Sequence, residues 1–305
     1  THPVRITLGP TSPVHLDATA VPEATSDSPR PDLPAGNPEE LPWQLRLYSK
    51  SLKKRQKIEL LVDQIRGLPG ERRLLITHGD NNGVLNFELR RSGGTWSWME
   101  MEQDQIRGME ELLGEPVLSA RPRELPAESG SLDVVISLDV QEHLRPDELE
   151  VFHRELYRIT APGGHVVVTT PNGDPWKPVS ILRRAIGMTK EKYGHQVYGY
   201  NISQHQKMLR AAGFVPTAAG SYSGFFTELV ELGINFAYTT LLSRRRTGRE
   251  RGEIAPTSVE RLAKVEKQYR LYSAVYPFLK ALSRLDAIAP LGHGYAVSVV
   301  GRRTG

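Results

Sequence analysis

Apolar and polar residues follow two periods along the chain, and the two periods alternate. Short runs rich in apolar and β-branched residues predict strands, and some of them are apolar throughout, which is typical of strands buried on both faces. Strands are expected at residues 73–77, 95–100, 117–118, 132–138, 165–170, 214–222 and 295–302. Between them, apolar residues recur at helical spacing. Helices are expected at residues 43–65, 83–91, 103–113, 146–159 and 203–213, with Ser203 as a capping residue and Gln206 completing its capping box.

Strands that alternate with helices predict an α/β fold, a Rossmann-like doubly wound sheet of about seven strands. No helix is evident just after the sixth expected strand, so the seventh strand is expected to join the sheet antiparallel. About seventy residues separate it from the sixth strand, and we interpret residues 222–293 as a helical insertion or cap. Residues 41–221 and 294–305 then form the main domain. Residues 1–40 are rich in Pro, Ser, Thr and Asp and are expected to be disordered.

Composition excludes several kinds of chemistry. The chain of 305 residues has no cysteine, which excludes disulfides, thiolate metal sites, iron–sulfur clusters and a cysteine nucleophile. No apolar run approaches the roughly 20 residues of a membrane-spanning helix, and no signal peptide is evident. The expected location is therefore the cytoplasm, including the periphery of a membrane.

The formal net charge is only +4, but the basic residues are clustered. One group of five lies between Lys50 and Lys57, and a second group of five lies between Arg244 and Arg251. Either group can be a solvated face. Either can equally contact an anionic lipid, a phosphorylated substrate or nucleic acid.

Candidate ligand-binding residues lie where the expected strands end. The stretch "LLITHGDNNGVL", residues 74–85, runs from a strand through a turn with Gly79 and Gly83 into a helix. Such a unit typically presents a nucleotide-like ligand to the start of the helix. Glu100 ends the second strand, and a carboxylate there can accept hydrogen bonds from the hydroxyls of a ribose, whichever nucleoside carries it. Leu138 and Asp139 follow the fourth strand at the same edge of the sheet.

Three longer motifs carry a family resemblance. They are "LDVVISLDVQEHL", "ELYRITAPGGHVVVTTPN" and "LRAAGF", which cover the fourth strand, the fifth strand with its preceding helix, and the turn before the sixth strand. From about residue 50 to residue 302 the chain resembles class I S-adenosylmethionine-dependent methyltransferases of type 11, close to the ubiquinone and small-molecule methyltransferases. The turn departs from the family pattern, with Thr77 in the place of an acid and Asn81 in the place of the middle glycine.

The resemblance implies S-adenosyl-L-methionine as the cofactor. Gly79 and Gly83 would let the backbone approach its methionine part without a Cβ in the way. Glu100 would hold both ribose hydroxyls, and Asp80 would face the cofactor's ammonium group. His78, Leu138 and Asp139 complete the predicted cofactor-binding set. The helix at 43–65 would lie over the cofactor as a lid, or it would simply pack on the sheet.

Two histidines are candidate catalytic residues. A methyltransferase needs a base only when the acceptor atom must lose a proton. His143 lies in the Glu-His-Leu motif, where related quinone O-methyltransferases also carry a histidine, and His195 lies in a loop that commonly forms the acceptor side of the pocket. Tyr193, Tyr198 and Tyr200 flank His195 and could contact a substrate. Each histidine could also be purely structural. We expect His205 to be an ordinary surface residue, and no metal site is predicted.

The sequence therefore predicts a methyltransferase that acts on a small-molecule, lipid-like or glycan acceptor, with O-methylation expected. One alternative is a non-catalytic protein of the same fold that has lost cofactor binding, and another is an NAD-dependent oxidoreductase. Nucleic acid is not an expected partner, because the Asn/Asp-Pro-Pro-aromatic motif of base-amino methyltransferases is missing after the fourth strand. The insertion at 222–293 either caps the acceptor pocket or also docks on an anionic membrane.

Overall fold

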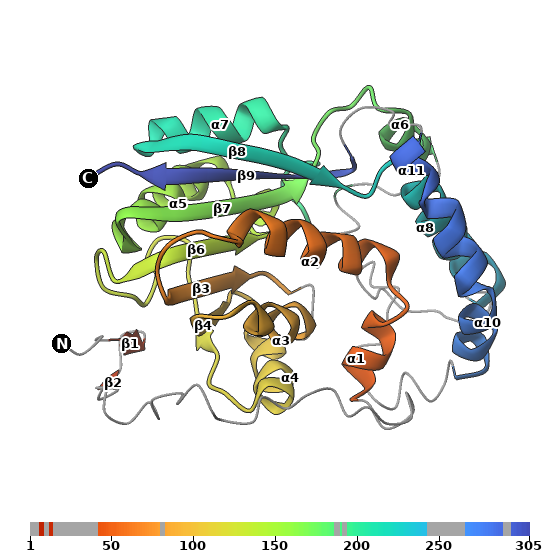
Figure 1. Cartoon of the computed structure of the whole chain (residues 1–305), viewed down its shortest axis with the longest axis horizontal. Helices are drawn as coiled ribbons and strands as arrows, with labels where there is room; N and C mark the ends of the chain where they lie inside the picture. The colour runs from red at the N-terminus through yellow and green to blue at the C-terminus, as the bar shows by residue number, and fades with distance from the viewer. Residues whose placement is uncertain are drawn as a thin grey trace.

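The computed structural model describes residues 6–8, 12–14, 42–79, 83–185, 190, 194–242, 266–288 and 294–305. Its centre is a seven-stranded sheet with the strand order β5-β4-β3-β6-β7-β9-β8 (Figure 1). The strands are β3 (Arg72–Thr77), β4 (Thr95–Glu100), β5 (Leu118–Ser119), β6 (Leu132–Leu138), β7 (Thr160–Pro171), β8 (Phe214–Tyr222) and β9 (Ala296–Arg303). β9 runs antiparallel to both β7 and β8, whereas the first five strands are parallel. The predicted Rossmann-like sheet with an antiparallel last strand is confirmed.

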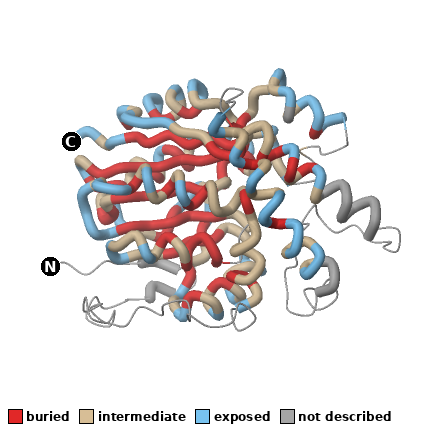
Figure 2. Tube along the Cα trace, turned by 45° about the vertical axis from the view of Figure 1, so that its right-hand side comes forward, coloured by how far each residue is buried: buried red, intermediate tan, exposed pale blue. Residues whose placement is uncertain are grey.

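Helices cover both faces of the sheet. One face carries α1 (Trp43–Tyr48), α2 (Leu52–Ile65), α3 (Val84–Leu89) and α4 (Gln103–Leu113). The other face carries α5 (Pro146–Ile159) and α7 (Ile202–Ala211). Neighbouring strand residues supply the two cores in turn: Leu75 packs in the first, and Leu74 and Ile76 pack in the second. This alternation buries the sheet on both sides, as the red strands in Figure 2 show.

Several predicted element boundaries agree with the structure, whereas one predicted helix and one predicted helix cap do not. The helices at 103–113 and 146–159 and the strand at 132–138 have the expected bounds. The single helix predicted at 43–65 is instead two helices, because Ser51 accepts a hydrogen bond from the Lys54 amide at 3.3 Å and starts α2 anew. The predicted cap at Ser203 is wrong. Asn201 caps α7, and Gln204 completes the capping box with bonds of 2.8 and 2.9 Å.

The insertion contributes helices at the edge of the sheet where the parallel strands end (Figure 1). They are α8 (Phe225–Leu242), α10 (Glu266–Ser283) and α11 (Leu285–Ile288), and α6 (Pro178–Ala185) lies beside them. The Asp286 carboxylate of α11 accepts hydrogen bonds from the amides of Phe226 and Thr227, at 2.7 and 3.0 Å, and so caps α8. Tyr269 donates a hydrogen bond to the Arg46 carbonyl at 2.8 Å, which fastens α10 to α1. No helix within the described residues is long and apolar enough to span a membrane.

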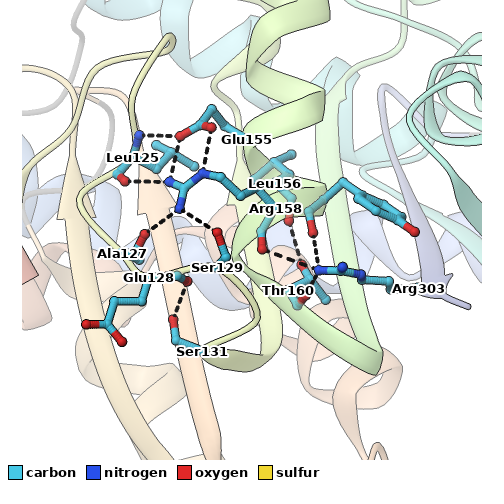
Figure 3. A network of polar contacts seen from close by, with 11 residues as sticks. Leu125, Ala127, Glu128, Ser129, Ser131, Glu155, Leu156, Arg158, Thr160 and Arg303 are labelled. Carbon is cyan, nitrogen blue, oxygen red and sulfur yellow. Dashed lines mark hydrogen bonds and ion pairs between the residues drawn. The ribbon is translucent and has the colours of Figure 1, made fainter. Parts of the chain in front are cut away.

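A network of polar contacts lies at the opposite end of the strands, near the start of β7 (Figure 3). Arg158, near the end of α5, is held by Glu155 and donates to the carbonyls of Leu125 and Ala127 at 3.0 and 2.8 Å. Arg303 of β9 donates to the Thr160 carbonyl there. These contacts fix the edge of the sheet that faces away from the predicted ligand site.

The predicted disordered segment, residues 1–40, contains two short strands that pair antiparallel, β1 (Ile6–Leu8) and β2 (Ser12–Val14). The other residues of this segment lie outside the described residues, as does the second basic cluster at Arg244–Arg251. The first basic cluster is not simply a solvated face. Lys57 is 4% exposed, and both it and Lys53 form ion pairs with carboxylates of other elements.

Candidate active site

The glycine turn after β3 has the backbone geometry that its sequence predicts. Gly79 and Gly83 have φ angles of +66° and +80°, in the left-handed region that favours glycine. A Cβ on Gly83 would lie 3.1 Å from the Cα of Met109, so this glycine also allows α3 to pack on α4. A Cβ on Gly79 would lie 3.1 Å from the Cγ of Glu102. Asp80, predicted to face the cofactor's ammonium, lies outside the described residues.

Glu100 ends β4 beside this turn, and its side chain holds the turn in place. One carboxylate oxygen, Oε1, accepts hydrogen bonds from the amides of Gly79 and Glu102, both at 2.8 Å. The other oxygen, Oε2, accepts the hydroxyl of Thr77 at 2.6 Å. Thr77, in the place of the family's usual acid, therefore supplies a donor that a second carboxylate could not.

The same contacts limit what Glu100 can do for a ligand. Glu100 is 1% exposed. Burial raises the pKa of its carboxyl, and the three hydrogen bonds act in the opposite direction without cancelling this effect. A carboxylate offers about four acceptor positions, and three are occupied here. One position is left, so accepting both ribose hydroxyls would require the Thr77 hydroxyl or an amide to move. Glu102, which sequence reasoning did not single out, presents a more exposed carboxylate at the same turn, 3.7 Å from Nδ1 of His78.

Asp139 follows β6 with a φ of +51°, and its carboxylate is already paired. The Lys57 ammonium of α2 forms an ion pair with it, and the Thr169 hydroxyl donates to it at 2.9 Å. Leu138, the residue before it, is 2% exposed and packs in the core against α2 and α3. The first turns of α2 therefore reach the predicted cofactor edge, while Leu61 and Ile65 further along α2 pack on the sheet.

Three imidazole rings come together at this edge. His78, after β3, stacks on His143 with ring centroids 4.0 Å apart and planes inclined by 6°. His195 meets His143 edge-on, with centroids 4.6 Å apart. Both predicted catalytic histidines therefore lie in one cluster, although His143 and His195 are about fifty residues apart in the sequence.

Backbone contacts explain why the distant His195 reaches this cluster. The amides of Gln196 and Val197 donate to the Glu142 carbonyl at 2.7 and 3.4 Å, and this clamps the loop onto the short 3-10 helix η3 (Gln141–His143). Tyr200, at the end of the loop, donates its amide to the Pro171 carbonyl at 3.0 Å. Burial raises the pKa of the Tyr200 phenol, with a further contribution from Glu142, so this side chain stays neutral as a donor.

The cluster also contains a set of possible metal ligands. One ligand atom from each of Glu142, His143 and His195 lies within 4.8 Å of the others. A carboxylate and two imidazoles suit a borderline divalent cation such as Zn²⁺ or Mn²⁺. The sequence spacing gave no sign of this set, because His195 joins it only through the fold. The expectation from the sequence that the protein has no metal site stays a prediction.

A pocket of about 50 Å³ opens beside His195. Its wall is formed by the segment after β7, by α6, by the His195 loop and by the residue before β9. The residues lining it are Asn172, Gly173, Asp174, Pro175, Ser180, Arg183, Arg184, Lys190, His195, Tyr198 and Tyr295. Tyr198 is 44% exposed here, whereas Tyr193 lies outside the described residues. Arg183, Arg184 and Tyr295 were not predicted as site residues.

His205 contradicts its prediction. It is fully buried on α7 rather than on the surface, and its Nε2 lies 2.8 Å from the Thr170 hydroxyl. Burial, with a smaller contribution from His153, lowers the pKa of His205 to about 3. It is therefore a neutral core residue. A single histidine between polar neighbours gives no periodic signal that would reveal this.

The fold and the site together define a doubly wound enzyme class with a nucleoside-type ligand at the carboxyl edge of its sheet. Residues 79–168 match the family model of a methyltransferase domain. With the strand order described above, the chain contains a methyltransferase domain and has the class I fold, and S-adenosyl-L-methionine is the methyl donor that defines this class. The NAD-dependent alternative is not supported.

Solved structures agree with this fold. The chain is similar to geranyl diphosphate C-methyltransferase from Streptomyces coelicolor A3(2), solved with Mg²⁺, geranyl diphosphate and S-adenosyl-L-homocysteine. The TM-score is 0.53 at 14% identity, over 88% of this chain and 86% of that one. It is also similar to phosphoethanolamine N-methyltransferase 2 from Haemonchus contortus, in complex with S-adenosyl-L-methionine, with a TM-score of 0.50, 15% identity and coverage of 82% and 52%. At the level of sequence, no curated protein is a significant match.

Proposed function

We propose that the enzyme methylates a hydroxyl group of a small-molecule or lipid-like acceptor, with His143 or His195 as the general base. The observation that carries this proposal is the packing of these two rings against each other, between the glycine turn and the pocket. A hydroxyl must lose its proton as the new bond forms, and imidazole is the usual group for that task near neutral pH. A glycan acceptor also offers hydroxyls and fits the same chemistry.

The position of each residue in the site suggests its role in the proposed reaction. When bound, S-adenosylmethionine supplies a methyl group that its sulfonium has already activated. His143 takes the proton of the acceptor hydroxyl, and His195 and His78 hold its ring from an edge and a face. Tyr198 and Tyr295 line the pocket and orient the acceptor beside the histidines.

The turn fits such a methyl donor on two observations. Both glycines have positive φ angles and no side chain, so the backbone can approach a ligand closely. Glu100 also fixes the turn by accepting a hydrogen bond from the Gly79 amide. We propose that Gly79, Gly83, His78 and the Asp139 region contact the donor. Of the described acids at this turn, Glu102 is more exposed than Glu100 and is therefore better placed to bind the ribose.

Titration calorimetry with S-adenosylmethionine and S-adenosylhomocysteine tests this assignment. We expect both to bind at micromolar concentrations, whereas NADH is expected to give no heat. An absence of heat with either compound at high micromolar concentration would favour the alternative of a non-catalytic protein that has lost cofactor binding. Heat with NADH alone would contradict both readings.

A metal-assisted version of the reaction is a second candidate, favoured by the arrangement of Glu142, His143 and His195. A divalent cation held there would lower the pKa of the acceptor hydroxyl, so that its proton could be released to solvent water without an imidazole base. Turnover that is abolished by a chelator and restored by Mn²⁺ or Zn²⁺ would select this version. Turnover that survives the chelator leaves the imidazole as the base.

We further propose that the cap touches an anionic membrane. On α10, Leu271, Val275 and Phe278 are exposed at helical spacing, with exposed fractions of 70%, 45% and 71%. Arg270 and Arg284 flank this face, and Asp286 is the one acid between Tyr269 and Ile288 and already caps α8. An apolar face bordered by cations complements a surface of anionic lipid.

We expect the protein to sediment with vesicles that contain phosphatidylglycerol and to be released by salt. The variant Leu271→Ser/Phe278→Ser should lose most of this binding, because it removes apolar contact without changing charge. The matched control is Val215→Ser, an exposed apolar residue on β8 away from the cap. If the wild type ignores anionic vesicles at low salt, or if the α10 variant binds as well as the control, the cap is only a cover for the pocket.

A further inference from the structure

We propose that the pocket beside His195 binds an anionic group of the acceptor, a carboxylate or a phosphate. This inference rests on the proposed function and narrows its substrate class. Three cationic side chains, Arg183, Arg184 and Lys190, line the pocket, against one carboxylate, that of Asp174. Asp174 is also engaged locally, because its Oδ1 accepts the amide of Trp176 at 3.0 Å.

Packing fixes the position of Arg183 in the cationic wall, which consists of Arg183, Arg184 and Lys190. Arg183 is 9% exposed, and its guanidinium carbon lies 4.1 Å from the centre of the Tyr295 ring. The ammonium of Lys53, from α2, lies 3.7 Å from the centre of the same ring. Two cations from different helices therefore hold one aromatic side chain that faces the pocket.

Charge accounting favours an anion at this place. Glu228 of α8 is fully buried and pairs with both Lys53 and Arg183, at 3.0 and 2.7 Å. One carboxylate thus serves two cations, and Ser223 also donates to it. Burial raises the pKa of the Glu231 carboxyl behind this group and lowers the pKa of the Lys53 ammonium, so the two shifts act on opposite charges. The pocket lining itself has three cations and one carboxylate, and this is the surplus of positive charge that favours an anion.

Backbone carbonyls hold the two outer cations in place. Arg184 donates to the Pro175 carbonyl, and Lys190 donates to the Gln196 carbonyl at 2.8 Å. The Lys190 contact also ties the cationic wall to the loop that carries His195.

The pocket is continuous with the proposed catalytic group. His195 lines the pocket and at the same time touches His143. An acceptor whose anionic group binds at α6 would thus extend toward the two imidazoles with its other end. The geometry points to a molecule that carries both a hydroxyl and an anionic group, such as a hydroxy acid, a phosphorylated alcohol or a lipid with a phosphate headgroup.

Binding of simple anions tests the inference without any acceptor. We would titrate inorganic phosphate and acetate into the full-length protein, with chloride adjusted to keep ionic strength constant. The variant Arg184→Met/Lys190→Met removes the two more accessible cations and leaves the buried Arg183–Glu228 pair in place. Arg210→Met, an exposed arginine on α7, is the matched control.

We expect the wild type and the control to bind phosphate or acetate, and the double variant to bind it at least about tenfold more weakly, since charge-assisted contacts to the anion are lost. Equal binding by the double variant and the control, or no binding by the wild type, would overturn the inference. Phosphatidic acid vesicles distinguish the sources: loss of vesicle binding in the double variant indicates a headgroup, and retained vesicle binding indicates a soluble anion.

Calorimetry with S-adenosylhomocysteine on the same proteins keeps the two proposals apart. Protein that binds this compound but neither anion contradicts only the pocket inference. Protein that binds the anions but not this compound contradicts the proposed function and leaves the anion site in place.

Discussion

Replacing His143 with alanine is expected to lower turnover of a hydroxyl acceptor by about 10²–10⁴ while binding of S-adenosylhomocysteine is unchanged. The magnitude is that of a lost general base. Glu100 holds the glycine turn through the Gly79 amide and the Thr77 hydroxyl, so the turn should keep its geometry when the His143 ring is lost. The measurement is methyl transfer to a confirmed acceptor, with calorimetry on the same preparation.

Matched variants show whether His143 acts as the base or only supports its neighbour. His78→Ala removes the stacked ring without removing either proposed base and should cost much less. If His195 is the base instead, His195→Ala will show the large loss and His143→Ala a small one. Unchanged turnover in both variants would assign the two rings to packing.

Replacing Glu100 with alanine is expected to have the second large effect, on stability and on cofactor affinity together. The change removes an acceptor of two backbone amides and one hydroxyl at a residue that is 1% exposed. Each buried donor left without a partner costs about 1–3 kcal/mol, so the loss of three pairings should lower the free energy of unfolding by about 3–9 kcal/mol. Cofactor affinity should fall by about 1.5–3 kcal/mol, because the Gly79 amide loses its anchor.

Glu100→Gln separates the two contributions. The amide keeps one acceptor oxygen and removes the charge, so stability should suffer less than in Glu100→Ala. Burial raises the pKa of the Glu100 carboxyl in the folded state, so the folded protein binds this proton more tightly than the unfolded chain does. This carboxyl therefore favours folding increasingly as pH falls through its folded pKa, and the glutamine variant should lose that part of the pH dependence. Chemical denaturation of wild type and variant between pH 4 and pH 8 measures it, and identical pH profiles would contradict the assignment.

The sheet was predictable from sequence because its strands are long apolar runs with clear periodicity. The run at 132–138 has the predicted bounds, and β9 was expected to be antiparallel because no helix was evident just after the sixth strand. The break between α1 and α2 was missed, since apolar spacing continues across Ser49–Ser51 while capping by Ser51 decides the backbone. Capping depends on a few hydrogen bonds that hydrophobic periodicity does not register.

The site was predictable only in part, because its residues come from segments far apart in the chain. Both catalytic candidates were identified by residue type and position, but their contact depends on the Glu142 carbonyl holding the loop after His195. The pairing of Lys57 with Asp139 joins α2 to the end of β6, and no local pattern encodes such a pair. The inward orientation of Glu100 follows from Thr77, whose hydroxyl donates where the family's acid could not.

The position of β9 between β7 and β8 constrains the order in which the molecule can fold. β8 has no described strand partner except β9, and the whole insertion lies between these two strands in the sequence. During synthesis, β7 therefore keeps an open edge, and β8 stays unpaired, until β9 has left the ribosome. Open edges of this kind invite association with other chains. The growing chain must protect that edge throughout the time needed to make the cap, which makes this interval the step most exposed to misfolding.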